Sequence, residues 1–161
     1  MSQETDKLFA KGLAAGFAGG TVIQGIERSG VSGKSSYLDT DGGVYDDKWF
    51  ADRAGGGQEI VKVDGVTYTR VYAGGTIPLV DLKLMRITKR DVMVFLKKQM
   101  VENGEKIRLG TNFEPEPEGD WRYVYKVLDT DPEIPLILGK ETIEYKGIKV
   151  FVHNFIICPI D

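Results

Sequence analysis

Hydrophobic positions in the first half of the chain repeat with the period of a helix and then with that of strands. Between residues 4 and 17 an apolar side chain recurs at every fourth position, which predicts a helix with one buried face, ended by Gly19 and Gly20. Strands are expected at residues 44–52, 59–63 and 66–72, and Asp64-Gly65 between the last two favours a type I′ hairpin turn. The buried face of the helix would consist of Phe9, Ala10, Leu13, Ala14 and Phe17.

The second half of the chain follows the same order of elements. Thr88 as N-cap with Asp91 three residues later is close to a capping box, and Asn103-Gly104 is a stop signal, so we expect a helix from about residue 89 to 102. Strands follow at residues 121–128, 142–145 and 149–155, the last two joined by Lys146-Gly147. The buried face of the helix would consist of Val92, Phe95, Leu96, Gln99 and Met100.

Two glycine-bounded segments echo each other at a constant spacing. GQEIVKVDG, residues 57–65, returns 82 residues later as GKETIEYKG, residues 139–147. Since the helix and the strands repeat as well, we predict one α+β domain over residues 1–161, a duplicated helix-plus-three-strand unit with two main helices on an antiparallel sheet. Repeat one would span about residues 4–77 and repeat two about residues 88–161. The alternative is two ordinary hairpins that share glycine turns.

The order of these motifs resembles a known family, the domain of unknown function 5680 (DUF5680) of bacteria and archaea. The motifs are FAGG (17–20), VYDDKWFADRAGGGQEIVKVDG (44–65), VMVFLKK (92–98), EGDWRYVYKV (118–127) and GKETIEYKG, so the resemblance covers nearly the whole chain. The family has no established activity, and its members are often fused to a helix-turn-helix domain, which implies by analogy a sensing or regulatory module. The ending FIICPID departs from the aromatic-glycine ending that is common in the family.

Composition narrows the partners and the compartment. The chain has 161 residues, 42% hydrophobic, and a net charge of −3, which allows a sizeable core and argues against nucleic acid or an anionic membrane as the direct partner. One cysteine, Cys158, rules out an internal disulfide framework and favours the cytoplasm. The apolar N-terminal stretch has no basic start and is too short and glycine-rich to span a membrane. We therefore expect a soluble protein.

Three motifs that could carry chemistry fail on spacing. GVSGKSS, residues 30–36, has Arg28 where a phosphate-binding loop requires glycine, so we interpret it as a flexible loop. His153 and Cys158 lie in one extended segment and would meet only if it bends, so we interpret Cys158 as structural. An acidic cluster lacks calcium-loop spacing and is interpreted as a solvated face; it consists of Asp39, Asp41, Asp46 and Asp47. No metal and no cofactor are expected.

Glu59 and Glu141 are the candidate catalytic residues. They occupy equivalent positions in the two hairpins, and strand alternation puts each on the same face as apolar neighbours, so both are expected to point inward. Two carboxylates near a pseudo-twofold axis would repel, raising one pKa and producing an acid and base couple. The alternative is that each begins an exposed strand or caps turn amides.

Aromatic side chains supply candidate ligand contacts. A groove between the repeats with aromatic walls and one acidic anchor would suit a cationic or amphipathic small molecule. Its candidate residues are Trp49, Tyr68, Tyr72, Trp121, Tyr123 and His153. The preferred hypothesis is a non-catalytic small-molecule-binding or regulatory module. The alternatives are a hydrolase or isomerase with Glu59 or Glu141 as general base, and an interaction module that forms a homodimer through its sheet edge or exposed aromatics.

Overall fold

A single antiparallel sheet with helices on one side makes up the fold. The computed structural model describes residues 3–16, 18, 23–24, 33–38, 42–51 and 53–160. In these residues eight strands pair in the order β1-β2-β3-β4-β5-β8-β7-β6. The strands are β1 (Ile23–Gln24), β2 (Gly33–Leu38), β3 (Val44–Ala51), β4 (Ala54–Val63), β5 (Val66–Thr76), β6 (Trp121–Thr130), β7 (Ile137–Tyr145) and β8 (Ile148–Ile160). The described helices are α1 (Gln3–Ala15), α2 (Leu79–Leu84) and α3 (Lys89–Asn103). The predicted α+β class with an antiparallel sheet is confirmed.

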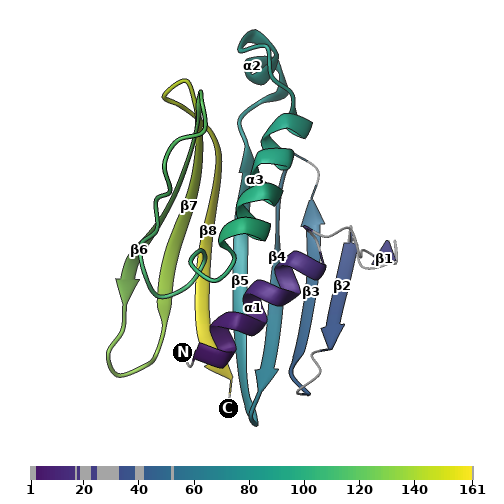
Figure 1. Cartoon of the computed structure of the whole chain (residues 1–161), viewed down its shortest axis with the longest axis vertical. Coiled ribbons are helices and arrows are strands. Elements are labelled where there is room, and N and C mark those ends of the chain that lie inside the picture. The colour runs from purple at the N-terminus through teal and green to yellow at the C-terminus, as the bar shows by residue number, and fades with distance from the viewer. Residues whose placement is uncertain are drawn as a thin grey trace.

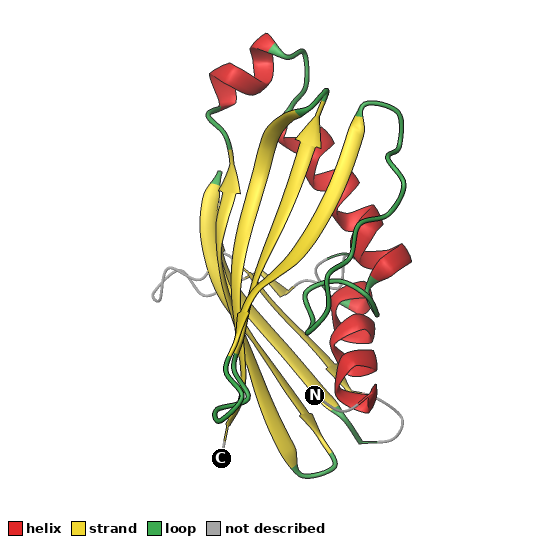
Figure 2. Cartoon of the chain, turned by 90° about the vertical axis from the view of Figure 1, so that its left-hand side faces the viewer, coloured by secondary structure: helices red, strands yellow, loops and turns green. Residues whose placement is uncertain are grey.

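Helices α1 and α3 cover the same face of the sheet, which we call the inner face (Figure 1). Seen from the side, the sheet is strongly twisted, and α2 stands beyond the end of the strands (Figure 2). On the outer face the described residues form no helix. Because side chains alternate between the two faces of a strand, every second residue points toward α1 and α3.

Six of the eight described strands form two mirrored sets of three, and β1 and β2 extend the first set. β3, β4 and β5 lie on one side, β6, β7 and β8 on the other, and β5 pairs with β8 in the middle. α1 precedes the first set of strands and α3 the second. A repeated helix-plus-three-strand unit would produce this arrangement, while the duplication itself stays a prediction.

The two predicted hairpin turns are confirmed. Asp64 and Gly65 have φ angles of 51° and 79°, and Lys146 and Gly147 have φ angles of 51° and 75°. Two successive residues with positive φ are the signature of a type I′ turn, whose twist matches that of the flanking strands. The first turn fixes the β4–β5 register, which places Glu59 opposite Arg70. In the β7–β8 hairpin the register shifts once between Ile143 and Glu144, and beyond this shift Glu141 lies opposite His153.

Helix α3 forms as its sequence predicts. The side chain of Thr88 accepts a hydrogen bond from the Asp91 amide, and the Asp91 carboxylate accepts one from the Thr88 amide, which completes the capping box. The predicted buried face is confirmed residue by residue. The helix ends at Asn103, as the predicted stop signal requires, although Gly104 has a φ of −53° and makes no left-handed cap. A Cβ at Gly104 would lie 3.2 Å from the Cβ of Ala10, so glycine there allows the close approach of α1.

Helix α1 is anchored on the first half of the sheet. Its side chains Leu8 and Phe9 form a buried cluster with Tyr45 of β3 and Val61 of β4. Of the predicted face, Phe9, Ala10 and Leu13 are buried and Ala14 is half-buried. Phe17, Gly19 and Gly20 lie outside the described residues.

Three described elements were not predicted from the sequence, namely β1, β2 and α2. α2 buries one side chain, Leu82, and exposes most of its apolar residues, so it shows little helical periodicity. Residues 33–36 of GVSGKSS belong to β2, and the interpretation of that part as a loop is wrong. These polar residues carry no strand pattern; their backbone pairs with β3, with Ser36 opposite Asp46. Residues 30–32 lie outside the described residues.

Candidate functional site

Glu59 on β4 is buried within a complete hydrogen-bonding shell. It points inward, as predicted, and is 0% exposed. Its carboxylate accepts hydrogen bonds from the Arg70 guanidinium, through Nε and, at 2.9 Å, through Nη2. The Tyr45 hydroxyl donates to Glu59 Oε1 at 2.9 Å. The guanidinium carbon of Arg70 lies 4.2 Å from the centroid of the Phe9 ring, so α1 closes this ion pair from above.

Glu141 on β7 has a matching environment in the other half of the sheet. Its carboxylate accepts hydrogen bonds from Arg108 Nε at 3.0 Å, Arg108 Nη2 at 2.7 Å and the Tyr123 hydroxyl at 2.6 Å. Burial raises the pKa of Glu141, but the charge and hydrogen bonds of Arg108 more than offset this, so the pKa lies below its usual value. Glu141 is therefore ionised and saturated with donors.

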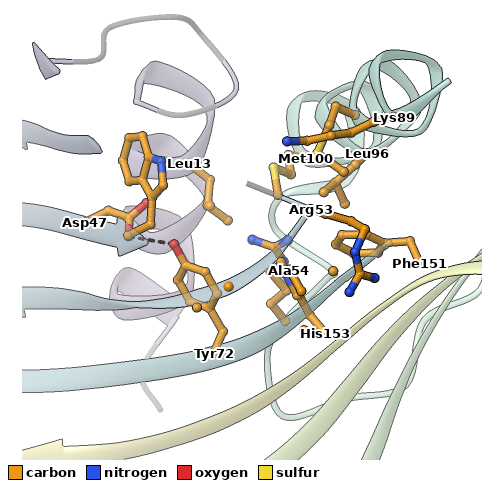
Figure 3. Close-up of a pocket in the computed structure, with 17 residues that line it drawn as sticks. Leu13, Asp47, Arg53, Ala54, Tyr72, Lys89, Leu96, Met100, Phe151 and His153 are labelled. Carbon is orange, nitrogen blue, oxygen red and sulfur yellow. Dashed lines mark hydrogen bonds between the residues drawn. The ribbon is translucent and has the colours of Figure 1, made fainter. Parts of the chain in front are cut away.

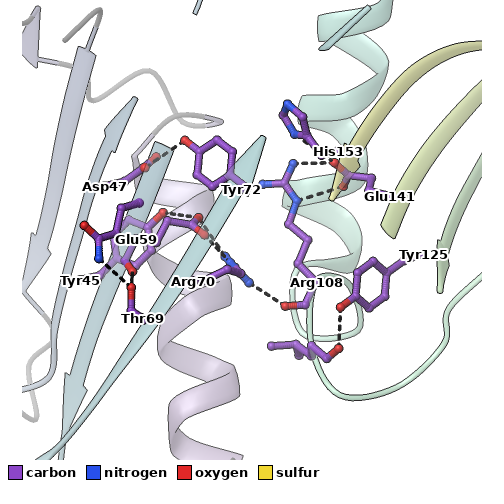
Figure 4. A network of polar contacts seen from close by, with 12 residues as sticks. Tyr45, Asp47, Glu59, Thr69, Arg70, Tyr72, Arg108, Tyr125, Glu141 and His153 are labelled. Carbon is purple, nitrogen blue, oxygen red and sulfur yellow. Dashed lines mark hydrogen bonds and ion pairs between the residues drawn. The ribbon is translucent and has the colours of Figure 1, made fainter. Parts of the chain in front are cut away.

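The two ion pairs are joined by one hydrogen bond. Arg70 Nη1 donates to the carbonyl oxygen of Arg108 at 2.9 Å (Figure 4). The two halves of the sheet differ in where the arginine that pairs with the glutamate comes from. Arg70 lies opposite Glu59 on the neighbouring strand, whereas His153 lies opposite Glu141 and the cation comes from Arg108, beyond α3. The His153 side chain is therefore not part of the ion pair between Glu141 and Arg108.

A pocket opens beside this network, between the inner face and the helices. Its cavity volume is about 70 Å³, and side chains from α1, α3, β3, β5 and β8 surround it (Figure 3). The apolar wall consists of Leu13, Trp49, Met93, Leu96, Met100 and Phe151. The polar wall consists of Asp47, Arg53, Tyr72, Lys89, Arg108 and His153. The pocket is thus amphipathic, and most of its apolar wall lies on the helices.

Asp47 is protonated near neutral pH. It is 2% exposed, and burial, reinforced by the charge of Glu59, raises its pKa to about 8, although the Tyr72 hydrogen bond and two arginines act in the opposite direction. The Tyr72 hydroxyl donates to Asp47 Oδ1 at 3.1 Å. A carboxyl in this state can donate its own proton to a ligand, which an ionised aspartate cannot do.

His153 is uncharged at neutral pH. Burial lowers its pKa to about 4, although Glu141, whose Oε2 lies 3.7 Å from His153 Nδ1, acts to raise it. Among the described residues, Nδ1 has no hydrogen-bond partner. The rings of Phe151 and Tyr72 lie 4.4 and 5.4 Å from the imidazole, centroid to centroid, and hold it in place.

Glycines make room for this ring. Gly74 lies opposite His153 in the β5–β8 register, and a Cβ there would lie 2.7 Å from His153 Cδ2. Gly74 and its neighbour Gly75 have φ angles of 153° and 152°, which L-residues rarely adopt. The YAGG glycines therefore serve close approach within the sheet beside the pocket.

The structure brings together three of the six predicted ligand contacts. Trp49, Tyr72 and His153 line the pocket. Tyr68, Trp121 and Tyr123 do not line this pocket. Tyr68 packs on the α1 cluster, Trp121 stacks on Phe95 with centroids 5.2 Å apart, and Tyr123 is bonded to Glu141.

The predicted ligand contacts include none of the four charged pocket residues, namely Asp47, Arg53, Lys89 and Arg108. The interpretation of Asp47 as part of a solvated face is wrong, because it alternates with Tyr45 and Trp49 on the inner side of β3. That alternation could have identified it. Arg108 follows α3 in a segment without periodicity, so no sequence signal placed it. Asp39 and Asp41 lie outside the described residues.

Among the described residues, the other candidate catalytic and metal-binding side chains do not come together. β8 runs without interruption from Ile148 to Ile160, so His153 and Cys158, five residues apart, fall on opposite faces of the sheet. Within the described ranges, no three His, Cys, Asp or Glu side chains gather where they could hold a metal ion. No helix in the described part of the chain is long and apolar enough to cross a membrane.

Comparisons of the chain with protein-family models, with curated proteins and with solved structures found no match.

Proposed function

We propose that the protein is a non-catalytic module that binds a small amphipathic molecule in the pocket between the inner face and α3. The observation that carries this proposal is that two polar side chains at the apolar cavity have hydrogen-bonding capacity left for a ligand. Asp47 holds a proton near neutral pH, and His153 Nδ1 is buried without a described partner. Buried polar groups are normally satisfied, so a polar ligand atom there would remove a cost of about 1–3 kcal/mol.

The size of the cavity limits what it encloses. Its volume of about 70 Å³ has room for a group of a few heavy atoms and lies well below the roughly 300–1,000 Å³ of pockets for drug-sized ligands. Met93 and Met100 line the helix side, and methionine side chains adapt to irregular ligands because they are unbranched. A larger ligand would therefore displace these two side chains.

The predicted catalytic glutamates and His153 do not suit general-base catalysis. A general base at neutral pH needs a pKa near the working pH. Glu141 is saturated by donors that lower its pKa, Glu59 is fully buried in an ion pair, and the pKa of His153 is about 4, which makes it a weak base. The two glutamates act as structural anchors in this proposal, and the enzyme alternative loses its predicted base.

Two further roles stay predictions. The resemblance to DUF5680 supports a regulatory use of the bound molecule. The protein-interaction role is supported by two exposed apolar residues, Val71 and Ile156. They lie opposite one another on the outer face and are 42% and 46% exposed. The described chain shows nothing that covers them.

A thermal-shift screen of a metabolite library tests the proposal. Wild type is compared with Met93→Ala, which removes part of the pocket wall and so enlarges the pocket. The matched control is Met85→Ala, because Met85 is half-buried and lies outside the pocket. We expect compounds that stabilise wild type and Met85→Ala but stabilise Met93→Ala differently. A broad library without any stabilising compound, or with compounds that act equally on all three proteins, would contradict binding in this pocket.

A further inference from the structure

The imidazole of His153 has one enclosed edge and one edge at the pocket. Its side chain is 14% exposed, while Nδ1 is enclosed and has no hydrogen-bond partner among the described residues. Cδ2 lies against the backbone of β5, because a Cβ at Gly74 would be 2.7 Å from it. Since His153 lines the pocket, the edge that remains for a ligand is the one formed by Cε1 and Nε2.

A carboxylate beside Nδ1 determines which ring nitrogen carries the proton. Glu141 Oε2 lies 3.7 Å from Nδ1, and the two residues are opposite one another in the β7–β8 register (Figure 4). The oxygens of an ionised carboxylate only accept hydrogen bonds, so they repel a lone pair on Nδ1 and attract an N–H there. In a neutral imidazole one nitrogen donates and the other accepts. The proton therefore belongs on Nδ1, which leaves Nε2 as an acceptor.

Arg108 opposes a second proton on this ring. Its guanidinium lines the same pocket and donates to Glu141 at 3.0 and 2.7 Å, so the negative charge of Glu141 is already matched. A protonated imidazole would add an unmatched cation to a buried ion pair, which is costly. Burial lowers the pKa of His153, and Arg108 acts in the same direction, although Glu141 raises it. The imidazole therefore has a single proton to place.

Aromatic rings surround the imidazole without satisfying it. The ring centroids of Phe151, Tyr72 and Phe155 lie 4.4, 5.4 and 5.9 Å from that of His153. Tyr72 is the one polar ring of the three, and its hydroxyl donates to Asp47. In the described part of the chain no side chain donates a hydrogen bond to His153. Nε2 is thus an acceptor in apolar surroundings that lacks a donor.

We infer that the ligand is an alcohol, a phenol or an N–H heterocycle that donates an uncharged O–H or N–H to His153 Nε2, an inference that rests on the binding function proposed above. Its apolar body packs against Met93, Leu96 and Phe151. Hydrogen bonds in a chain polarise one another, so a donor at Nε2 strengthens the attraction between the Nδ1 proton and Glu141. The ligand in this way also stabilises the enclosed end of the ring.

The position of the imidazole proton is tested first. The chain contains a single histidine, so the ring nitrogen signals of protein with 15N-labelled histidine all belong to His153. Their cross-peaks to the ring protons distinguish Nδ1 from Nε2. At pH 7 we expect a protonated Nδ1 and an unprotonated Nε2. A proton on Nε2, alone or together with one on Nδ1, would overturn the inference.

Phenol and toluene then test the donor, because they have nearly the same shape and differ in a hydroxyl against a methyl group. Dissociation constants are measured from backbone amide signals for wild type, His153→Asn and His153→Gln. The amide of asparagine reaches about as far as Nδ1 and keeps a donor toward Glu141. The amide of glutamine reaches about as far as Nε2 and can accept a hydrogen bond there.

Phenol should shift the Nε2 signal of wild type until it saturates, and toluene should leave this signal in place. The ratio of phenol affinity to toluene affinity should fall about tenfold in His153→Asn, the size of one hydrogen bond, and be partly restored in His153→Gln. Phenol binding that leaves the Nε2 signal in place would overturn the inference, and this result needs no variant. A ratio that is unchanged in a folded His153→Asn would overturn it as well.

The failure of the donor and the failure of the proposed function give different results. If phenol and toluene bind equally, with affinities that depend on Met93, the proposed function stands and the donor class is wrong. If neither probe binds, the donor class is also overturned, and the library screen decides the proposed function separately.

Discussion

Asp47 and His153 give the protein a distinctive dependence of stability on pH. The pKa of Asp47 rises from 3.8 to about 8 on folding, so between these values the folded state binds a proton that the unfolded state lacks. The free energy of unfolding then falls by about 1.4 kcal/mol for each pH unit. The pKa of His153 falls from 6.5 to about 4, so in that interval the unfolded state binds the extra proton and stability rises with pH by the same slope.

The two contributions cancel below pH 6.5 and separate above it. From pH 5 to 6.5 wild type should show a plateau, and from pH 6.5 to 8 Asp47 alone should lower the free energy of unfolding by about 2 kcal/mol. Asp47→Asn keeps an acceptor for Tyr72 but does not titrate. It should therefore gain about 2 kcal/mol from pH 5 to 6.5 and then stay level.

Urea denaturation at pH 5, 6.5 and 8 measures these differences. Asp46→Asn makes the same change on the outward side of β3 and should keep the decline of wild type above pH 6.5. Parallel pH profiles for wild type and Asp47→Asn would refute the reasoning, because they would show that Asp47 does not hold a proton in the folded state.

Two further outcomes follow from the same contacts. Glu141→Gln leaves the buried Arg108 without its counter-charge and should lower the free energy of unfolding by about 3–5 kcal/mol in chemical denaturation, and a loss below about 1 kcal/mol would contradict a tight pair. Gly57→Ala places a Cβ 2.5 Å from the Tyr72 hydroxyl and should lower the melting temperature much more than Gly65→Ala, a turn position with open space and a φ of 79°, so equal losses would count against the close approach.

Local signals in the sequence were sufficient to predict the main helices and hairpins. The capping pair of Thr88 and Asp91 and the turns at Asp64 and Lys146 act over a few residues, so they can be recognised without tertiary context. Alternation also placed Glu59 correctly on the inner face. Periodicity failed for β2, because its polar strand is defined by pairing with β3.

The pocket depended on contacts that no local pattern encodes. The repeat suggested that Glu59 and Glu141 would meet as an acid and base pair, yet each has its own arginine. Arg70 could be paired with Glu59 through the hairpin register, but Arg108 reaches Glu141 from a loop 33 residues away. That long-range contact leaves His153 without the ion pair and so shapes the polar wall.

The methionine side chains offer the most direct measurement of ligand binding in the pocket. The chain has four methionines, of which Met93 and Met100 line the pocket and Met85 does not. With methyl-labelled methionine, NMR spectra are recorded during titration with a compound that stabilises wild type, and Met93→Leu and Met100→Leu provide the assignments. We predict saturable shifts of the Met93 and Met100 methyl signals and an unchanged Met85 signal. Saturation that leaves the Met93 and Met100 signals in place would contradict the pocket as the binding site.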